Sequence, residues 1–330
     1  MVSFWRRKPD YFVHPTHHAC SSEWYYPKNT IGISETLARD NREQMRSMNM
    51  RDAEKVLLQI RELLNDLNII FFLRHGTCLG AVRDRELIPW DDDIDIGSII
   101  GMNNLDEESI YKTVNDFRAA GFEVKILQTN FHIGVELSKS GIRIDWTCYR
   151  IIEENIFQYP AIKIPVHLYK NLKPVCLLGE AFFVPNPPEE YLTLKYGPEW
   201  RVPKKTDFEG DIIDSISESA IIERSGIPSR ILKFLFPNKN VIRIQVLNCD
   251  MQPIEKMEVT VVGVGRRTTD HNGYAKFYLL NQDYYAMTIG SRKEREILYE
   301  EILRPGGEYR YVQDLNQRSG RIHVLTERIK

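Results

Sequence analysis

The chain has 330 residues with a formal net charge of −2, and its 42% hydrophobic and 27% charged content is ordinary for a globular protein of one large or two smaller domains. This charge balance excludes a general affinity for nucleic acid or anionic lipid. No uncharged apolar run approaches the ~20 residues of a membrane span, and five isolated cysteines are typical of a reduced, cytosolic protein. We therefore expect a cytoplasmic protein without an integral membrane segment.

The first quarter of the chain passes from irregular to strongly patterned sequence. Residues 1–33 are rich in aromatic side chains, histidine and proline, and we expect an irregular arm packed on the core. From residue 34 the pattern becomes helical, with an apolar stripe over residues 56–67 that predicts a helix covering one face of a sheet. The apolar run 69–73 predicts a strand buried on both sides. The turn at residues 75–77 should end this strand, and a short helix over 78–84 should follow.

An acidic cluster comes next, with four carboxylates within five residues: Asp91, Asp92, Asp93 and Asp95. A solvated turn or a helix cap would tolerate such a cluster, but Ile94 and Ile96 alternate strictly with two of the carboxylates, which predicts a strand with Asp93 and Asp95 on one face. An EF-hand loop would need glycine at position 96 and glutamate at position 102, where isoleucine and methionine stand. Two adjacent ionised carboxylates repel, so unless one holds a proton the pair predicts a bound hard cation such as Mg²⁺ or Mn²⁺.

The following segments supply a third carboxylate. Helices are predicted over 109–120 and 189–196, and strands over 122–127, 132–137 and 142–149. In the last of these strands Asp145 leaves the core face, as Asp93 and Asp95 do in theirs. The three carboxylates would therefore meet if the two strands are neighbours.

The chain changes character past about residue 237. Alternating segments separated by turn signals predict six or seven short strands, which is typical of a β-sandwich. This sandwich could position an acceptor, mediate oligomerisation or only extend the structure.

A Gly-Thr pair, Gly76 and Thr77, stands where the predicted buried strand gives way to a helix. Such a junction offers backbone N–H groups and a hydroxyl to a phosphate, and the helix N-terminus adds positive potential. Joined to two carboxylates on the next strand and a third on a later one, it forms the phosphate cradle and metal site of phosphoryl or nucleotidyl transfer.

A family resemblance is carried by residues 75–97, HGTCLGAVRDRELIPWDDDIDIG, which closely resemble the LicD (fukutin-related) family of phosphotransferases, a branch of the polymerase-β-like nucleotidyltransferase fold. Residues 143–146 are similar to that family's second acidic strand, and residues 185–203 to its C-terminal motif. His75 and Cys78 depart from the commoner glycine and leucine, but both lie outside the carboxylates. The resemblance spans residues 57–203, whereas the last ninety residues look like a transthyretin-type or carboxypeptidase-regulatory sandwich.

The resemblance implies a nucleotidyltransferase-like mixed sheet flanked by helices over residues 34–238, which together with the small all-β sandwich domain predicted over residues 239–330 makes an α+β fold. It also implies transfer of a phosphorylated alcohol of the phosphocholine, ribitol phosphate or glycerol phosphate type. The donor would be CDP-linked, the acceptor a hydroxyl of a cell-surface glycan or lipid-linked glycan, and the released product CMP. The enzyme would act in the cytoplasm, at the inner face of the membrane where its acceptor is lipid-linked.

In this reaction Asp93 and Asp95 are expected to hold one or two Mg²⁺ ions. Asp145 is expected to complete the metal shell and to accept the proton of the acceptor hydroxyl. The other expected substrate-binding residues are Gly76 and Thr77 at the donor phosphates, Arg83 as a bidentate phosphate clamp, and Asp91 and Asp92, whose roles are left unassigned. A solvated arginine is the alternative for Arg83, and Trp90 and Trp146 are expected either to stack on a ligand or to pack in the core.

Two other functions compete with this prediction. A nucleotidyltransferase would share the fold but would attach NMP to a sugar, a small molecule, RNA or a protein and release pyrophosphate. A non-catalytic glycan-binding protein would keep the first domain only as a relic. The three convergent carboxylates argue against a relic, because they repel one another without a cation.

Overall fold

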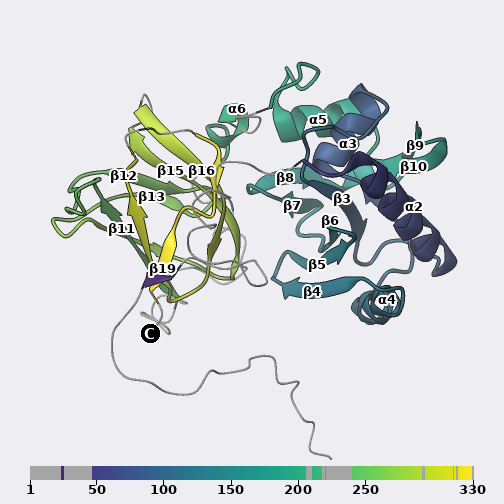
Figure 1. The fold of residues 1–330 in the computed structure, drawn as a ribbon, viewed down its shortest axis with the longest axis horizontal. Coiled ribbons are helices and arrows are strands. Elements are labelled where there is room, and N and C mark those ends of the chain that lie inside the picture. The colour runs from purple at the N-terminus through teal and green to yellow at the C-terminus, as the bar shows by residue number, and fades with distance from the viewer. Residues whose placement is uncertain are drawn as a thin grey trace, which may run out of the picture.

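The computed structural model describes residues 24–25, 47–205, 210–217, 220, 240–291, 294–314, 316 and 319–328. Most of the arm predicted over residues 1–33, the start of the helical segment at residue 34 and the connection over 221–239 lie outside the described residues. The described chain has an α+β fold, in which a mixed sheet flanked by helices is followed by all-β sheets (Figure 1).

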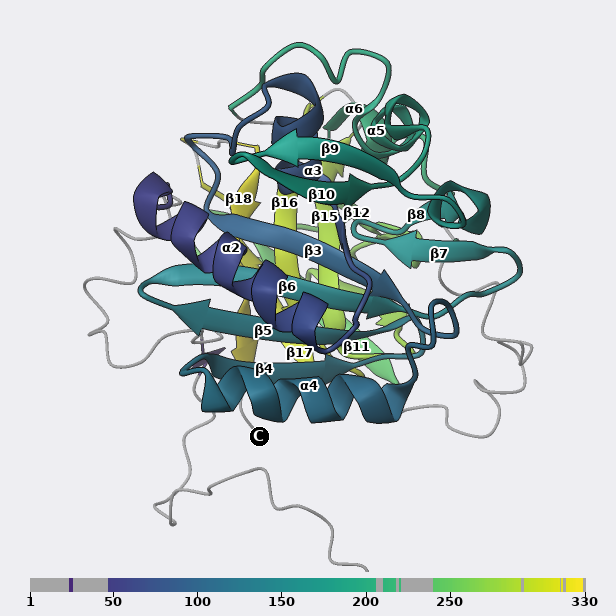
Figure 2. The same cartoon turned by 90° about the vertical axis from the view of Figure 1, so that its right-hand side faces the viewer.

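A five-stranded mixed sheet forms the centre of the first part of the chain, in the order β2-β3-β6-β5-β4. Its strands are β2 (Phe72–Leu73), β3 (Asp93–Ile99), β4 (Glu123–Gln128), β5 (His132–Lys139) and β6 (Ile142–Tyr149). Strands β3 and β6 run parallel, whereas the other neighbouring strands are antiparallel. Helix α2 (Met50–Asp66) crosses one face of this sheet and α4 (Glu107–Ala119) runs along β4, as Figure 2 shows.

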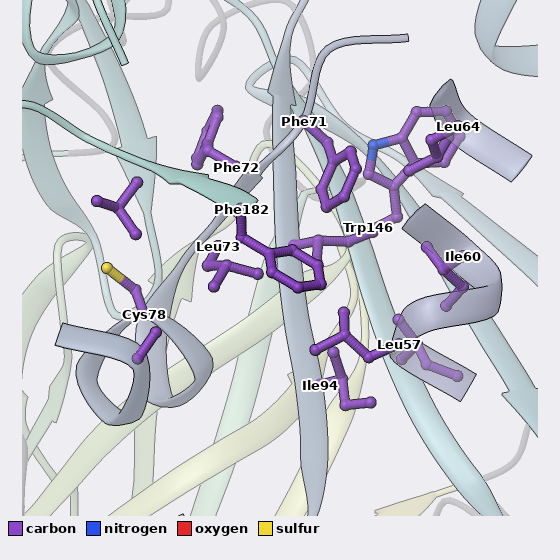
Figure 3. Packing of buried hydrophobic residues seen from close by; sticks show 14 of the residues in the cluster. Leu57, Ile60, Leu64, Phe71, Phe72, Leu73, Cys78, Ile94, Trp146 and Phe182 are labelled. Atoms are coloured by element: carbon purple, nitrogen blue, oxygen red, sulfur yellow. The ribbon is translucent and has the colours of Figure 1, made fainter. Parts of the chain in front are cut away.

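Helix α2 packs on the sheet through the apolar stripe seen in the sequence. Its first turn is capped by Asn49, whose side chain accepts the Asp52 backbone N–H. Leu57, Ile60 and Leu64 are fully buried against the sheet, near Ile94 and Trp146 (Figure 3). Burying each such side chain contributes about 1.5–3 kcal/mol. Because successive side chains of a strand alternate, Asp93, Asp95 and Asp145 must lie on the opposite face.

Smaller elements cover the edge of the sheet next to β2. Helix α3 (His75–Arg83) follows β2, and two hairpins are formed by β7 (Asn155–Gln158) with β8 (Ile162–Pro165) and by β9 (Lys173–Leu177) with β10 (Glu180–Val184). A 3₁₀ turn (Val166–Tyr169), α5 (Pro188–Tyr196) and α6 (Gly210–Ile213) complete this part. In Figure 2, α3 and α5 lie together at one edge of the sheet.

Two local predictions differ from the structure. The buried strand predicted over 69–73 is a two-residue edge strand, and Ile70 is 40% exposed. The helix predicted from residue 78 begins at His75, whose left-handed backbone (φ 44°) turns the chain directly out of β2. Gly76 and Thr77 therefore belong to the first turn of α3 and not to a separate loop.

The C-terminal part is a sandwich of two five-stranded sheets in the orders β1-β19-β17-β11-β14 and β13-β12-β15-β16-β18. Its strands are β1 (Trp24–Tyr25), β11 (Val241–Leu247), β12 (Glu258–Val261), β13 (Gly265–Thr268), β14 (Tyr274–Tyr278), β15 (Asp283–Ser291), β16 (Glu294–Leu303), β17 (Glu308–Val312), β18 (Arg321–Ile322) and β19 (Thr326–Arg328). The described residues after 240 thus form nine strands, more than the six or seven predicted. One apolar core joins the two sheets, with Ile244, Val261 and Leu298 fully buried.

Candidate active site

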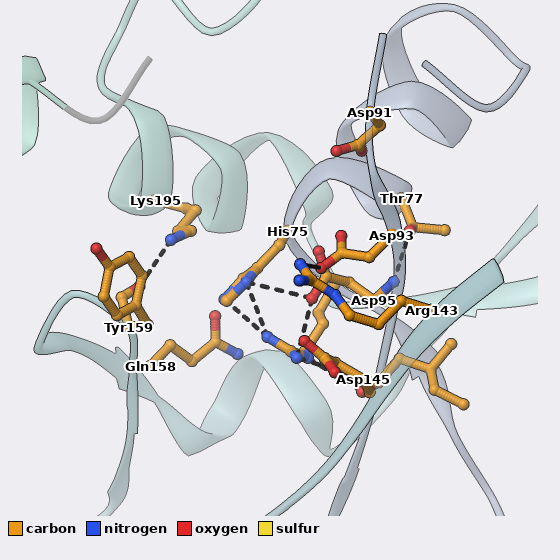
Figure 4. Close-up of polar contacts among 12 residues, drawn as sticks. His75, Thr77, Asp91, Asp93, Asp95, Arg143, Asp145, Gln158, Tyr159 and Lys195 are labelled. Atoms are coloured by element: carbon orange, nitrogen blue, oxygen red, sulfur yellow. Dashed lines mark hydrogen bonds and ion pairs between the residues drawn. The ribbon is translucent and has the colours of Figure 1, made fainter. Parts of the chain in front are cut away.

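Three carboxylates converge on the face of the mixed sheet away from α2. Strand register places Asp95 of β3 directly beside Asp145 of the parallel strand β6. Asp93, Asp95 and Asp145 each offer a carboxylate oxygen, and these oxygens lie within 4.8 Å of one another (Figure 4). The alternation in the sequence thus gave the correct face, and the parallel pairing of β3 with β6 brings the two strands together.

Arg74 provides the first counter-charge, and sequence reasoning missed it. It is 5% exposed, and its Nη2 lies 2.9 Å from Asp95 Oδ1. Its Nε donates to the Ile96 carbonyl at 3.0 Å, and its Nη1 lies 2.8 Å from His75 Nδ1. A lone arginine at the end of an apolar run was the only signal for it, since charge is rare in so buried a position unless paired.

Arg143 provides the second counter-charge, two residues before Asp145 on the same face of β6. Its Nη2 lies 2.6 Å from Asp93 Oδ2 and 3.2 Å from Asp92 Oδ2. The site therefore holds two guanidinium groups against five carboxylates, because Asp91 lies close by as well. Sequence reasoning included Arg143 only as part of the segment 143–146, which resembles the family's second acidic strand.

Burial and the repulsion between neighbouring carboxylates raise the pKa values of Asp145 and Asp95. Burial, followed by the charge of Asp93, raises the pKa of Asp145 to about 7, although Arg143 acts in the opposite direction. Burial also raises the pKa of Asp95 well above its ordinary value, against the influence of Arg74. Asp145 Oδ1 is buried and has no hydrogen-bond partner among the described residues. An oxygen-rich site with an unpartnered, buried carboxylate oxygen fits a hard divalent cation.

Asp91 lies against the N-terminal turn of α3. The Asp91 carboxylate approaches Gly76 so closely that a Cβ at position 76 would collide with it. Only glycine fits at this position without a shift of Asp91. Burial and then the charges of Asp93 and Asp92 raise the pKa of Asp91 well above its ordinary value. Asp91, Asp92 and Asp93 form a second group whose carboxylate oxygens lie within 4.8 Å of one another. Asp93 belongs to both groups.

Thr77 lies near Asp95 in a way that the sequence did not predict. Its side chain is buried, and its Oγ1 accepts the Asp95 backbone N–H at 2.8 Å. Strand β2 ends at Leu73, so this hydroxyl takes the place of the next carbonyl in the β2–β3 ladder. Thr77 is not among the residues that line the cavity over the carboxylates. Its hydroxyl thus holds the backbone of Asp95, and its predicted contact to a donor phosphate stays a prediction.

A second layer of hydrogen bonds holds the start of α3. The Tyr191 hydroxyl of α5 accepts the His75 backbone N–H at 3.0 Å and donates to Gln158 Oε1 at 3.0 Å. Lys195 is fully buried, and its Nζ donates to the Tyr159 carbonyl at 2.6 Å. Burial, with the charges of Lys195 and Arg74, holds the pKa of His75 well below its ordinary value. The segment that resembles the C-terminal family motif thus supports the site through α5.

Basic and aromatic side chains line one side of the cavity. Arg83 donates from Nε and Nη2 to the Asp84 carboxylate at 2.6 to 3.0 Å, so its guanidinium already has a bidentate partner. Lys205 Nζ lies 5.3 Å from the centre of the Trp90 ring. We call Arg83, Trp90, Trp200, Lys204 and Lys205, all of which line the cavity, the basic wall. Trp146, in contrast, is fully buried, and its Nε1 donates to Ser98 Oγ in the core.

The cavity over the carboxylates has a volume of about 260 Å³ and is lined by both parts of the chain. The mixed sheet contributes Glu136 beside Asp145, because β5 and β6 pair in that register. The β-sandwich contributes a set that we call the sandwich wall: Asp283, Tyr284, Tyr299, Glu300, Ile322 and His323. None of these residues was predicted from the sequence, because no local pattern connects the two regions.

Comparison with known proteins gives the family of the mixed-sheet part. Residues 68–187 match the family model described as LicD/FKTN/FKRP, nucleotidyltransferase domain. Ribitol-5-phosphate transferase FKTN of Macaca fascicularis is 27% identical over 212 residues, which cover 61% of this chain and 44% of that protein. The human protein of the same name aligns with the same identity and coverage. An uncharacterised protein of Rickettsia prowazekii is 29% identical over 159 residues, or 44% of this chain and 54% of that protein.

The chain thus spans less than half the length of the two FKTN proteins. The matched segment contains β3 and β6, with Asp93, Asp95 and Asp145, together with Arg74 and Arg143. The match agrees with the predicted resemblance, whose limits were residues 57 and 203. Residues 68–187 therefore resemble the nucleotidyltransferase domain of the LicD/FKTN/FKRP family.

Proposed function

We propose that the protein is a metal-dependent phosphotransferase, which moves a phosphorylated alcohol from a CDP-linked donor to a hydroxyl of a glycan or lipid-linked glycan and releases CMP. The observation that carries this proposal is the convergence of Asp93, Asp95 and Asp145 at the cavity, with Arg74 and Arg143 beside them. The family of residues 68–187 supports the same reaction class. The name of the FKTN relatives supports ribitol phosphate as one transferred group.

In the proposed site Asp93, Asp95 and Asp145 would hold Mg²⁺ or Mn²⁺, which when bound neutralises charge on the donor diphosphate. Asp91 and Asp92 would join Asp93 around a second ion, since the two carboxylate groups share that residue. This gives Asp91 and Asp92 a role that the sequence left open. Gly76 has no side chain, and this leaves room for the Asp91 carboxylate at the start of α3.

The acceptor hydroxyl would attack the phosphorus of the alcohol phosphate. The bond between that phosphorus and the bridging oxygen breaks, and CMP leaves with the electron pair. Asp145 accepts the hydroxyl proton through Oδ1, the oxygen without a hydrogen-bond partner among the described residues.

The basic wall would hold the nucleotide end of the donor. Lys204 and Lys205 add positive charge beside the Trp90 and Trp200 rings, and an aromatic ring offers a stacking surface to a cytosine. Arg83 would contact a donor phosphate only by exchanging its Asp84 partner. The donor diphosphate would then lie between this wall and the carboxylates.

Product analysis tests the proposal. The full chain is incubated with CDP-ribitol, CDP-glycerol or CDP-choline, each with and without Mg²⁺, and nucleotides are separated by anion-exchange chromatography. We expect Mg²⁺-dependent CMP from at least one donor and at least a 100-fold lower rate for Asp95→Asn. Release of pyrophosphate from CTP or ATP, with a nucleotidylated product, would favour nucleotidyl transfer instead. Binding of glycan without turnover of any donor would favour the non-catalytic alternative.

None of the helices within the described residues is long and apolar enough to cross a membrane. The cytoplasmic location stays a prediction from the sequence. Fractionation of cells producing the full chain, with detection in the cytosolic and membrane fractions, is the measurement that checks it.

A further inference from the structure

The β-sandwich faces the carboxylates directly. In Figures 1 and 2, β15 and β16 lie on the side of the mixed sheet opposite α2. The Tyr284 hydroxyl of β15 donates to Glu136 Oε1 at 2.8 Å, and Glu136 is the neighbour of Asp145 across β5 and β6. The Glu300 backbone N–H donates to the Tyr159 hydroxyl at 3.0 Å. The sandwich is thus held to the mixed-sheet part around the cavity itself.

A β-bulge brings Glu300 into the sandwich wall. Tyr285 pairs with Glu301 and Met287 with Leu298, so the two residues 299 and 300 lie opposite the single residue 286. Glu300 has a left-handed backbone, with φ 51°, which is uncommon for a residue with a side chain. Bulges of this kind redirect a side chain and are frequent beside active sites.

The carboxylates of the neighbouring residues Glu300 and Glu301 have different surroundings. Glu301 accepts hydrogen bonds from the backbone N–H groups of Val324 and Leu325 at 2.7 and 3.0 Å. Both of its carboxylate oxygens are therefore engaged within the sandwich. Glu300 instead lines the cavity. Burial raises the pKa of Glu300 to about 8, and the charge of Arg143 acts in the opposite direction.

The two walls of the cavity differ in charge. The basic wall carries Arg83, Lys204 and Lys205, with Glu199 next to Trp200, whereas the sandwich wall carries Asp283, Glu300 and His323 and approaches Glu136 through Tyr284. A diphosphate would be attracted by the charges of the basic wall, whereas Asp283 and Glu300, whose pKa values are raised by burial, offer it no positive charge. Carboxylates and tyrosines in a partly apolar wall are instead suited to hydroxyl groups and sugar rings, since a carboxylate oxygen accepts from a hydroxyl and an aromatic ring covers an apolar ring face.

We propose that the sandwich wall is the acceptor subsite, in which Tyr284 and Glu300 hydrogen-bond the hydroxyl groups of a carbohydrate and set its specificity. This inference rests on the proposed function, because it assigns the acceptor side of the same cavity. The C-terminal sandwich is then a part of the active site, and neither an oligomerisation module nor a structural extension.

Carbohydrate binding is measured without turnover, by saturation-transfer NMR on the full chain. The probes are the methyl glycosides of xylose, glucose, galactose and N-acetylgalactosamine. We expect the wild type to bind at least one of them, and Tyr284→Phe and Glu300→Gln each to weaken that binding about tenfold, as expected for loss of a hydrogen bond to a buried polar site. The matched control is Tyr274→Phe, which removes a tyrosine–glutamate bond of 3.2 Å to Glu308 elsewhere in the sandwich. It should leave glycoside binding unchanged.

Donor affinity is measured in parallel by calorimetry with CDP-ribitol and Mg²⁺. We expect Tyr284→Phe to change donor affinity less than about twofold, because its hydroxyl lies on the acceptor side. If no glycoside binds the wild type, or if Tyr284→Phe and Glu300→Gln bind glycosides as well as Tyr274→Phe does, the inference is wrong. If glycosides bind as expected but no CDP-alcohol does, the proposed function fails while the carbohydrate subsite stands.

Discussion

Replacing Thr77 by valine removes the hydroxyl that accepts the Asp95 backbone N–H, without changing the shape of the side chain. This N–H is buried beside the end of β2, and the structure offers it Thr77 Oγ1 at 2.8 Å. Valine leaves the donor without that partner. A buried donor that loses its acceptor costs about 1–3 kcal/mol. We therefore expect the free energy of unfolding to fall by about 2 kcal/mol, which corresponds to a decrease in Tm of roughly 4–8 °C.

The same substitution at Thr113 is a matched control. Thr113 is as buried as Thr77, at 2% against 1% exposure, but its hydroxyl is the donor, to the Ser109 carbonyl of α4. That carbonyl keeps its helical partner when the hydroxyl is lost, so Thr113→Val should cost less than about 0.5–1 kcal/mol. The comparison separates the loss of an acceptor for a buried N–H from the effect of placing valine in a buried position.

The assay is urea unfolding followed by tryptophan fluorescence, with CMP release from the active CDP-alcohol measured on the same preparations. Because Asp95 would be held less firmly, we expect Thr77→Val to lower the rate at saturating Mg²⁺ about tenfold or more, and Thr113→Val to leave it within twofold. If the two variants lose the same stability and the same activity, the Thr77 hydroxyl does not position Asp95 and our interpretation of the Gly-Thr pair is wrong.

Three further changes test neighbouring features. Gly76→Ala should lower stability by about 1–3 kcal/mol and impair Mg²⁺-dependent turnover, because its Cβ would displace the Asp91 carboxylate. For metal-free protein, the free energy of unfolding should fall by about 1–4 kcal/mol as pH rises from 4 to 7, since the folded state keeps the Asp145 proton up to its pKa of about 7 while the unfolded chain loses it near the ordinary value of 3.8. Arg74→Lys should cost about 2–4 kcal/mol, because an ammonium cannot reproduce the contacts to Asp95 and the Ile96 carbonyl together.

Each of these changes has a control in the same chain, measured by the same urea titrations. A Cβ at Gly134 would meet its nearest atom at 3.6 Å, so Gly134→Ala should be tolerated. Asp145→Asn should make the pH dependence in EDTA shallower, with the remainder due to Asp91, Asp95 and Glu300, and an unchanged slope would mean that Asp145 does not contribute. Arg61 makes a similar pair of contacts, to the Ala181 carbonyl and Glu180, but is 23% exposed, so Arg61→Lys should cost less than about 1 kcal/mol. Equal costs at the two arginines would refute the special role of Arg74.

The sequence was most informative where a pattern has one physical solution. Strict alternation of isoleucine with Asp93 and Asp95 fixes the face of β3, and the same alternation fixes the face of Asp145 in β6. It could not decide that the two strands pair in parallel with Asp95 beside Asp145, because register and strand order depend on contacts across the whole sheet. The predicted meeting of the carboxylates was therefore conditional on that pairing.

The arginines and the sandwich wall lay beyond sequence reasoning for different reasons. Arg74 and Arg143 look like ordinary basic residues until the fold buries them against carboxylates. Glu300 depends on a bulge in β16, and on packing between regions whose hydrogen bonds join residues 141 and 148 positions apart in the sequence. The Gly-Thr motif led us to predict that Thr77 binds a ligand. In the structure β2 ends early, and the Thr77 hydroxyl accepts the Asp95 backbone N–H.

Direct titration with Mn²⁺, followed by electron paramagnetic resonance of the free ion, tests the central claim that carboxylates from β3 and β6 form one divalent metal site. The account predicts saturable binding to the wild type, and at least a tenfold weaker affinity for both Asp95→Asn and Asp145→Asn, whose carboxylates come from different strands. Glu108→Gln, at an exposed position in the first turn of α4, should bind as the wild type does. Wild-type Mn²⁺ affinity in Asp145→Asn would contradict the shared site and the mechanism built on it.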